Sequence, residues 1–359
     1  MIRTSAATAL AGALLATGAA LPALAAPPGV PVPVATADRA EPAASVRPLE
    51  GRPTAAADEV STLEFNSLEL GCFEEEPTQS AMWVTYRNTT DQVRTVTFAF
   101  TGYYLEPTTE TTFTYDVAPG TIGEFAFEVP GGVTYRFWEL TTPESEFDTM
   151  VSTHDCVNGD PFSDSDYFAD QFGMEIDWMF QQGLSTGWVE PDGTRTYRGL
   201  QPMARDAMAA FLYRLYGSPD FTVPDVATFT DVPAGTQFHR EIEWLASVGI
   251  TTGWDAQGAR EFRPLAPVNR DAMAAFLHRY SQLENPSTEE PPADAETFVD
   301  VPPGTQHFDA IMWMKHTGIS EGWAMADGWE YRPVTPVARD AIAAFVFRYI
   351  DNTAYWPKA

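Results

Sequence analysis

The chain has 359 residues, of which 44% are hydrophobic and 13% aromatic, and it carries a formal net charge of −29 at pH 7. This length and composition allow two or three domains with packed cores. The strong negative charge excludes a general nucleic-acid or anionic-membrane binder, because phosphate binding needs a basic face.

The first 25 residues have the pattern of a secretory signal peptide. Arg3 provides a short basic start, an Ala- and Leu-rich stretch follows, and Ala23-Leu24-Ala25 offers the small residues that a signal peptidase requires. The alternative is a membrane anchor, which fits this short stretch less well because Pro22 interrupts it. We therefore expect a secreted protein with no membrane span after signal cleavage.

Residues 26–58 are rich in Pro and Ala and lack periodicity, which indicates a disordered linker. Residues 59–158 then alternate short Val-, Thr- and aromatic-rich runs with turns, the pattern of an antiparallel β-sandwich of immunoglobulin-like architecture. The runs expected to form strands are 80–87, 93–100, 111–117, 123–129 and 132–140. We expect turns at 88–91 and 118–120, which would pair 80–87 with 93–100 and 111–117 with 123–129.

The chain contains two cysteines, Cys72 and Cys156. In an oxidising compartment such an isolated pair is expected to form a disulfide, which would tie the first and last strands of the sandwich together. The less favoured alternative is metal binding or thiol catalysis by the same pair.

From Phe162 onward the hydrophobic period becomes helical, and one pattern occurs three times, in residues 160–219, 225–285 and 294–352. Each copy opens with Phe-x-Asp, passes through a short helix with a central Trp to a Gly-Trp pair, and closes on Arg-Asp-Ala-x-Ala-Ala-Phe. In the second helix of the middle copy the apolar stripe consists of Met273, Phe276, Leu277 and Tyr280. A two-helix unit cannot bury such a stripe alone, so the three copies should share one core.

The Phe-x-Asp-Val opening, the Gly-Ile-x-x-Gly after the first helix and the Val-x-Arg before the second resemble the S-layer homology family over roughly residues 160–352. The resemblance implies a pseudo-threefold helical bundle that holds secreted proteins on Gram-positive walls by binding a secondary, often pyruvylated, cell-wall polysaccharide. The chain departs from the family's Thr-Arg-Ala-Glu signature, because Ala204, Asn269 or Ala338 precedes the arginine and an aspartate follows it. The implied ligand is therefore an anionic glycan rather than a pyruvylated polymer in particular.

Arginines at repeated positions are the first candidate glycan-binding residues. The set that matches the family's binding arginine is Arg205, Arg270 and Arg339, and a second set seven residues earlier is Arg198, Arg263 and Arg332. Both sets fall at a loop–helix junction, where helix N-terminal amides would add to their attraction for a carboxylate or phosphate. The alternative is that they form ion pairs with Asp206, Asp271 and Asp340 or with acids of the adjacent copy. A third set within the helices, Arg214, Arg279 and Arg348, should point elsewhere.

Repeated tryptophans are the second candidate. Those that follow a loop glycine are Trp188, Trp254 and Trp323. Such rings either stack on a sugar or join the core. The tryptophans in the middle of the first helices, expected in the core, are Trp178, Trp244 and Trp313.

The sequence contains no catalytic arrangement of the common types. The five histidines occupy no shared repeat position, and there is no Gly-x-Ser-x-Gly elbow. We expect neither a metal site nor a cofactor.

These observations together predict a multidomain α+β protein that is secreted, associated with the cell wall and non-catalytic. Its repeats would bind an anionic secondary cell-wall polysaccharide or a peptidoglycan-linked glycan and display the β-sandwich. One alternative is a secreted cell-wall or polysaccharide hydrolase that uses the repeats for targeting, and another is a protein-assembly scaffold.

Overall fold

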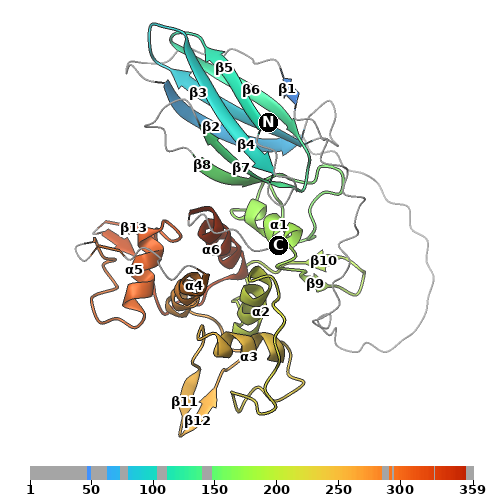
Figure 1. The fold of residues 1–359 in the computed structure, drawn as a ribbon, viewed down its shortest axis with the longest axis vertical. Coiled ribbons are helices and arrows are strands. Elements are labelled where there is room, and N and C mark those ends of the chain that lie inside the picture. The colour runs from blue at the N-terminus through green and yellow to red at the C-terminus, as the bar shows by residue number, and fades with distance from the viewer. Residues whose placement is uncertain are drawn as a thin grey trace, which may run out of the picture.

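The computed structural model describes residues 47–49, 63–72, 80–102, 111–139, 148–284, 291–292, 295–326 and 328–352. Its strand-rich part and its helix-rich part lie one above the other in Figure 1. The expected signal peptide lies outside the described residues, and so does the expected linker apart from Arg47–Leu49, which form a short strand. Within the described ranges no helix is long and apolar enough to cross a membrane.

The strand-rich part consists of two four-stranded antiparallel sheets. The first sheet has the order β1 (Arg47–Leu49), β6 (Thr121–Val129), β3 (Ser80–Asn88) and β2 (Leu63–Cys72). The second has the order β5 (Thr111–Val117), β4 (Arg94–Gly102), β7 (Thr134–Glu139) and β8 (Asp148–Ser152). Alternate side chains of both sheets meet in one apolar core, which includes Val84, Tyr86, Phe98 and Phe137.

All five expected strands are present, but the expected pairings of 80–87 with 93–100 and of 111–117 with 123–129 are wrong. β5 pairs with β4, whereas β6 pairs with β3. The turns after β3 and β5 therefore carry the chain from one sheet to the other. Asn88, which is fully buried, joins these two turns: its side-chain amide donates to the carbonyl oxygens of Gln92 and Val117, both at 2.8 Å.

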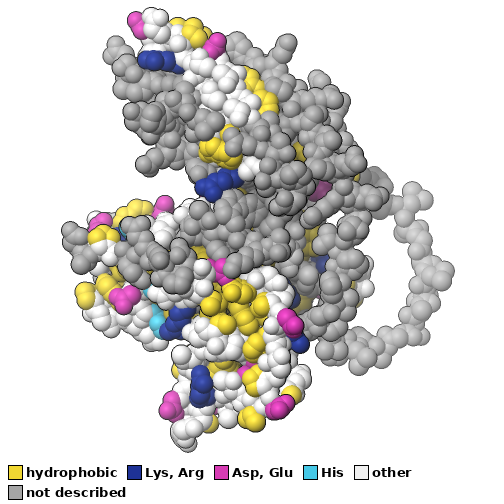
Figure 2. All heavy atoms as spheres, in the orientation of Figure 1, with side chains coloured by type: hydrophobic (Ala, Val, Ile, Leu, Met, Phe, Trp, Pro, Cys, Tyr) yellow, Lys and Arg dark blue, Asp and Glu magenta, His cyan; other side chains and the backbone are white. Residues whose placement is uncertain are grey.

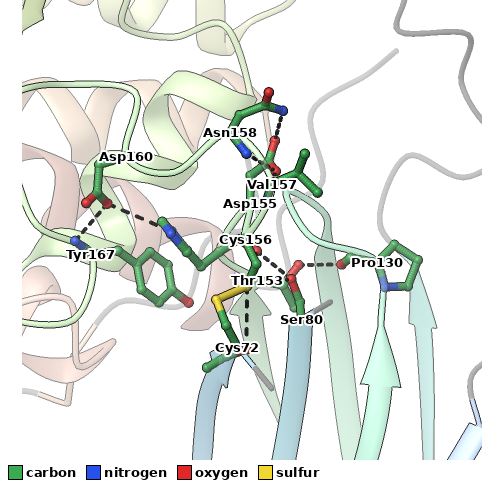
Figure 3. The surroundings of a disulfide bond; sticks show 12 residues. Cys72, Ser80, Pro130, Thr153, Asp155, Cys156, Val157, Asn158, Asp160 and Tyr167 are labelled. Carbon is green, nitrogen blue, oxygen red and sulfur yellow. Dashed lines mark hydrogen bonds and ion pairs between the residues drawn. A yellow bond between two sulfur atoms is a disulfide. The ribbon is translucent and has the colours of Figure 1, made fainter. Parts of the chain in front are cut away.

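The expected disulfide between Cys72 and Cys156 is confirmed, with a Cα–Cα distance of 5.9 Å. It joins the end of β2 to the segment after β8, and these two strands are edge strands of different sheets (Figure 3). Beside it, the Ser80 hydroxyl donates to the carbonyl oxygen of His154 at 2.6 Å. The bridge therefore fastens both sheets to the start of the helical part.

The helical part consists of three helix–hairpin–helix units. The first contains α1 (Gly173–Gln181), β9 (Trp188–Val189), β10 (Arg195–Thr196) and α2 (Arg205–Leu215). The second contains α3 (His239–Ser247), β11 (Trp254–Ala256), β12 (Ala259–Glu261) and α4 (Arg270–Glu284). The third contains α5 (Phe308–His316), β13 (Trp323–Met325), β14 (Gly328–Glu330) and α6 (Arg339–Asn352). The helices match the sequence expectation, whereas the hairpins replace what was expected to be a loop.

The units contact one another in a cyclic order. The second helix of each packs against the first helix of the next, so that α2 meets α3, α4 meets α5 and α6 meets α1. Three backbone hydrogen bonds repeat this order: Met203 N–H donates to Val337, Val337 N–H to Val268 and Val268 N–H to Met203, at 2.8, 2.9 and 2.8 Å. The expected stripe is buried in the core that all three units share, as Met273, Phe276, Leu277 and Tyr280. On the face shown in Figure 2 a hydrophobic area lies over the region of α2.

Strand β8 attaches the sheets to the helical units. The backbone N–H of Met150 donates to Asp351 in α6 at 2.7 Å. Gln181 in α1 donates to the carbonyl oxygen of Thr153 at 3.1 Å and accepts from the Ser152 hydroxyl at 3.0 Å. Because the Met150 side chain is also buried in the helical core, the two parts share one continuous interface.

Candidate functional site

The Phe-x-Asp opening of each unit fixes the backbone just after its hairpin. The carboxylate of Asp231 accepts two consecutive backbone N–H groups, from Phe262 at 2.8 Å and Arg263 at 2.7 Å. Arg263 has a positive φ of 58°, a conformation that non-glycine residues rarely adopt, and the carboxylate holds it there. The same clamp joins Asp164 to Tyr197 and Arg198, and Asp300 to Tyr331 and Arg332.

The glycine of each Gly-Trp pair is required by close packing. Gly253 has a positive φ of 68°, and an added Cβ would lie 2.5 Å from Phe229 Cε1 and 2.6 Å from the carbonyl oxygen of Glu261. Gly187 and Gly322 are equally crowded by the opening phenylalanine of their own units. This packing sets the position at which the following tryptophan starts its hairpin.

Each hairpin tryptophan contacts two guanidinium groups, one from its own unit and one from the preceding unit. The distances from ring centroid to Cζ at Trp254 are 4.0 Å for Arg205 and 4.8 Å for Arg263. We call these three residues the 1–2 cluster. The 2–3 cluster is Arg270, Trp323 and Arg332, with both distances 4.4 Å, and the 3–1 cluster is Arg339, Trp188 and Arg198, with distances of 4.4 and 4.6 Å. The structure thus brings all nine predicted residues together, three at each junction between units.

The arginines that begin the second helices are buried, with exposed fractions of 4% for Arg205, 6% for Arg270 and 5% for Arg339. Each donates its Nε–H to a carbonyl oxygen of the next unit, as Arg205 does to Phe262 at 2.9 Å. The equivalent bonds run from Arg270 to Tyr331 at 2.7 Å and from Arg339 to Tyr197 at 2.9 Å. Burial lowers the pKa of Arg205 to about 10, so this side chain is still a cation at neutral pH.

The alternative, ion pairing of these buried arginines, is not what the structure shows. Across the described ranges no ion pair joins Arg205, Arg270 or Arg339 to an acid. The carboxylate of Asp206 instead accepts the backbone N–H of Ala207 at 2.7 Å, and burial raises the pKa of this aspartate. Asp271 and Asp340 repeat this local bond with Ala272 and Ala341.

The expectation that helix N-terminal amides attract the ligand is wrong for the first two amides of each second helix. The backbone N–H groups of Arg205 and Asp206 donate to the carbonyl oxygens of Ala266 and Pro264, at 3.1 and 3.0 Å. The equivalent amides at Arg270, Asp271, Arg339 and Asp340 are occupied in the same way by carbonyl groups of the next unit. Backbone of the neighbouring unit therefore caps these helices, which explains how they form without a capping Thr.

The arginines that follow the hairpins are open to solvent, with side chains 35%, 48% and 40% exposed at Arg198, Arg263 and Arg332. Each forms an ion pair with a glutamate of its own hairpin, and the pairs are Arg198–Glu190 at 2.9 Å, Arg263–Glu261 at 3.1 Å and Arg332–Glu330 at 3.0 Å. These glutamates were not identified from the sequence. The signal that could have revealed them is the alternation of polar and apolar residues on either side of the turn Gln257-Gly258. Such alternation marks a β-hairpin, and this hairpin places Glu261 opposite Trp254.

The remaining repeated residues have structural roles. The mid-helix tryptophans are in the core as expected, with Trp178, Trp244 and Trp313 exposed by 0%, 3% and 0%. Arg214 and Arg279 point away from the clusters and donate to the carbonyl oxygens of Leu184 and Ile250, at 2.9 and 3.0 Å.

Each cluster provides two guanidinium groups and one indole ring. Two cations beside an aromatic ring suit an anionic group attached to a sugar, because the guanidinium groups attract the charge and the ring offers an apolar surface. Trp254 and Trp323 are 36% and 38% exposed, so a ligand can reach them. Among the described residues no three His, Cys, Asp or Glu side chains are placed to hold a metal ion.

A comparison with protein families finds that residues 228–274 match the model of the S-layer homology domain. The matched segment lies in the second unit and contains Trp254, Arg263 and Arg270, so it contributes to two of the clusters. A search of curated proteins found no match.

Proposed function

The chain carries an S-layer homology domain, which indicates a cell-surface protein that binds cell-wall polysaccharide, and we propose that its three clusters hold an anionic polymer of the wall. The ligand would be a secondary cell-wall polysaccharide or a peptidoglycan-linked glycan. The observation that carries this proposal is the contact of each hairpin tryptophan with two arginines, repeated at all three junctions.

The distribution of charge supports an anionic ligand. The chain has 50 acidic and 21 basic residues, yet each cluster combines two arginines with a single glutamate partner. The six cluster arginines thus lie in pairs beside tryptophan rings in an otherwise acidic protein, and the rings of Trp254 and Trp323 are exposed. An anionic sugar therefore finds its electrostatic partner at the clusters and meets repulsion elsewhere on the chain.

The proposal extends to the architecture. The cyclic helix contacts and the cyclic backbone bonds of Met203, Val268 and Val337 support a pseudo-threefold bundle of three S-layer homology repeats. The two sheets with one shared core support an immunoglobulin-like β-sandwich, which the bundle displays at the cell surface. The first 25 residues support secretion.

We infer a binding role rather than an enzymatic one from the chemistry of the repeated residues. Arginine supplies a permanent cation and tryptophan a stacking surface, whereas a hydrolase needs a general acid and a base or nucleophile. The carboxylates beside the clusters, Glu190, Glu261 and Glu330, are each held in an ion pair with an arginine.

Co-sedimentation of the mature protein with purified cell walls tests the proposal. The protein is expected to pellet with untreated walls and to stay in solution after chemical removal of the acidic polymer. Failure to pellet with untreated walls contradicts wall binding, and equal pelleting with stripped walls contradicts the anionic ligand. Release of soluble sugar during incubation would favour the hydrolase alternative instead.

A further inference from the structure

The third hairpin carries an exposed apolar surface beside the 2–3 cluster. Trp323, Met325 and Val299 are 38%, 44% and 49% exposed. Trp323 and Met325 are two residues apart in β13 and so project from the same face. Val299 lies against Gly328, the pairing partner of Met325, where an added Cβ would be 2.7 Å from Val299 Cγ1. We call Met325 and Val299 the apolar extension.

The apolar extension is continuous with the 2–3 cluster. Trp323 belongs to the cluster, and Met325 lies two residues after it in β13. Arg332, the solvent-exposed arginine of the cluster, places its Nη2 atom 3.8 Å from Met325 Sδ. A ligand held between Arg332 and Trp323 would therefore meet Met325 directly if it extended along the strand.

The apolar extension is specific to the third unit. At the position of Met325 the first unit has Glu190 and the second has Ala256. At the position of Val299 they have Ser163 and Thr230. The backbone N–H group at this position donates to a carbonyl oxygen of the unit's own hairpin in all three units, at 2.7 Å for Ser163, 2.8 Å for Thr230 and 2.9 Å for Val299. The hairpins of the second and third units also share strand length and register, so side chains make the third one apolar.

We propose that the apolar extension binds an uncharged sugar unit that adjoins the anionic unit held by the 2–3 cluster. This inference rests on the proposed function. Sugar rings have an apolar C–H face, and ligand sites combine such apolar contacts with a few polar groups that fix orientation. A second copy of this chain is the less suitable occupant, because two molecules with a net charge of −29 repel each other.

The test replaces the apolar extension by the residues of the second unit, as the double variant Met325→Ala/Val299→Thr. Because Ala256 and Thr230 occupy these positions in the same backbone arrangement, the variant is expected to fold. The control is Trp329→Arg, which alters an equally accessible side chain, 38% exposed, that pairs with Ala324 and so lies on the opposite face of the hairpin. The first and second units have Arg195 and Arg260 there.

The probes are purified cell-wall polysaccharide hydrolysed to single repeating units and to longer fragments, with affinity measured by calorimetry on the full mature protein. The double variant is expected to lose about tenfold in affinity for longer fragments, because it removes most of one apolar contact, and to bind single charged units as before. Trp329→Arg is expected to match the wild type with both probes.

Four outcomes would overturn the inference. Unchanged affinity of the double variant for longer fragments would show that the apolar extension takes no part. An equal loss for short and long fragments would place its effect in the 2–3 cluster itself. Dimerisation of the wild type in sedimentation experiments, abolished in the double variant, would identify a second copy as the occupant. If the wild type bound neither probe, the proposed function would fail as well.

Discussion

The guanidinium of Arg205, the first residue of α2, lies 4.0 Å from the ring centroid of Trp254 in the next unit. The same arginine donates to the carbonyl oxygen of Phe262 in that unit. One buried side chain therefore joins two units and also supports an exposed ring of the candidate site. Experiments on ligand binding need variants that separate these two roles.

Trp254→Ala is expected to lower affinity for wall polysaccharide several-fold and stability by about 1–2 kcal/mol, because the ring loses its contacts with Arg205 and Arg263. Trp254→Phe should retain part of the affinity and part of the stability, because it keeps an aromatic ring at this position. Urea unfolding and calorimetric titration measure the two effects. Trp329→Ala is the control, since this exposed tryptophan lies outside the clusters. Equal affinity of Trp254→Ala and the wild type would rule out a stacking role.

Gly253→Ala is expected to destabilise the second unit by about 3 kcal/mol, because the new methyl group would meet Phe229 and the Glu261 carbonyl group in a left-handed conformation. Gly258→Ala is the matched control. Gly258 also has a positive φ, 89°, but no atom lies within 4 Å of an added Cβ, so its cost should be about 1 kcal/mol. Similar unfolding midpoints for the two variants would show that the packing around Gly253 is unimportant.

Removal of the disulfide by Cys72→Ala/Cys156→Ala should cost about 4–5 kcal/mol in the chain-entropy account, since 84 residues separate the two cysteines. The loss is expected in unfolding of the sheets, followed by far-ultraviolet circular dichroism in urea. Polymer binding should persist under native conditions, because the clusters lie entirely in the helical units. Unchanged unfolding of the sheets would contradict this role of the bridge.

His154 should make stability depend on pH. It is buried after β8, with Nδ1 3.8 Å from the carboxylates of Asp160 and Asp177. Burial lowers the pKa of His154, but the interaction with Asp177 and the charges of Asp160 and Asp155 outweigh it, so the pKa is raised.

A raised pKa means that protonated His154 stabilises the fold at pH values below its unfolded pKa of about 6.5, and that this contribution is lost as the pH rises through the folded value. The stability advantage of the wild type over His154→Gln should therefore shrink as the pH rises from about 6.5 through the raised pKa of the folded protein. Urea unfolding of both proteins at several pH values checks this. A constant difference across the series would show that the histidine does not titrate against these acids.

Local patterns predicted the elements better than their partners. Runs such as 111–117 read as strands because alternation and β-branched residues act within a few residues. The same runs could not reveal that β5 and β6 belong to different sheets, since a short turn serves a hairpin and a crossover equally well. The bond from Asn88 to Val117, which joins the two crossover turns, lies outside any local pattern because 29 positions separate the two residues.

The repeats in the sequence likewise indicated the arginines and tryptophans of the candidate site but not how they combine. Repetition identified the arginines and tryptophans, because identical positions in three units imply identical roles. It could not show that Arg339 of the third unit meets Trp188 of the first, since this contact depends on closure of the cyclic order. Burial of Arg205 likewise depends on packing against the second unit, which the residues of its own unit do not reveal.

The most direct test of the central claim is calorimetric titration of purified wall polysaccharide into the mature protein and into the triple variant Arg198→Ala/Arg263→Ala/Arg332→Ala. These side chains are partly exposed, and each makes one surface ion pair and one contact with a cluster tryptophan, so each change should cost about 1 kcal/mol of stability. Arg240→Ala, which removes an exposed arginine from α3, is the control for charge. We predict at least about a tenfold loss of affinity in the folded triple variant and none in the control. Equal affinity of the triple variant and the wild type would contradict the assignment of the clusters as the glycan-binding site.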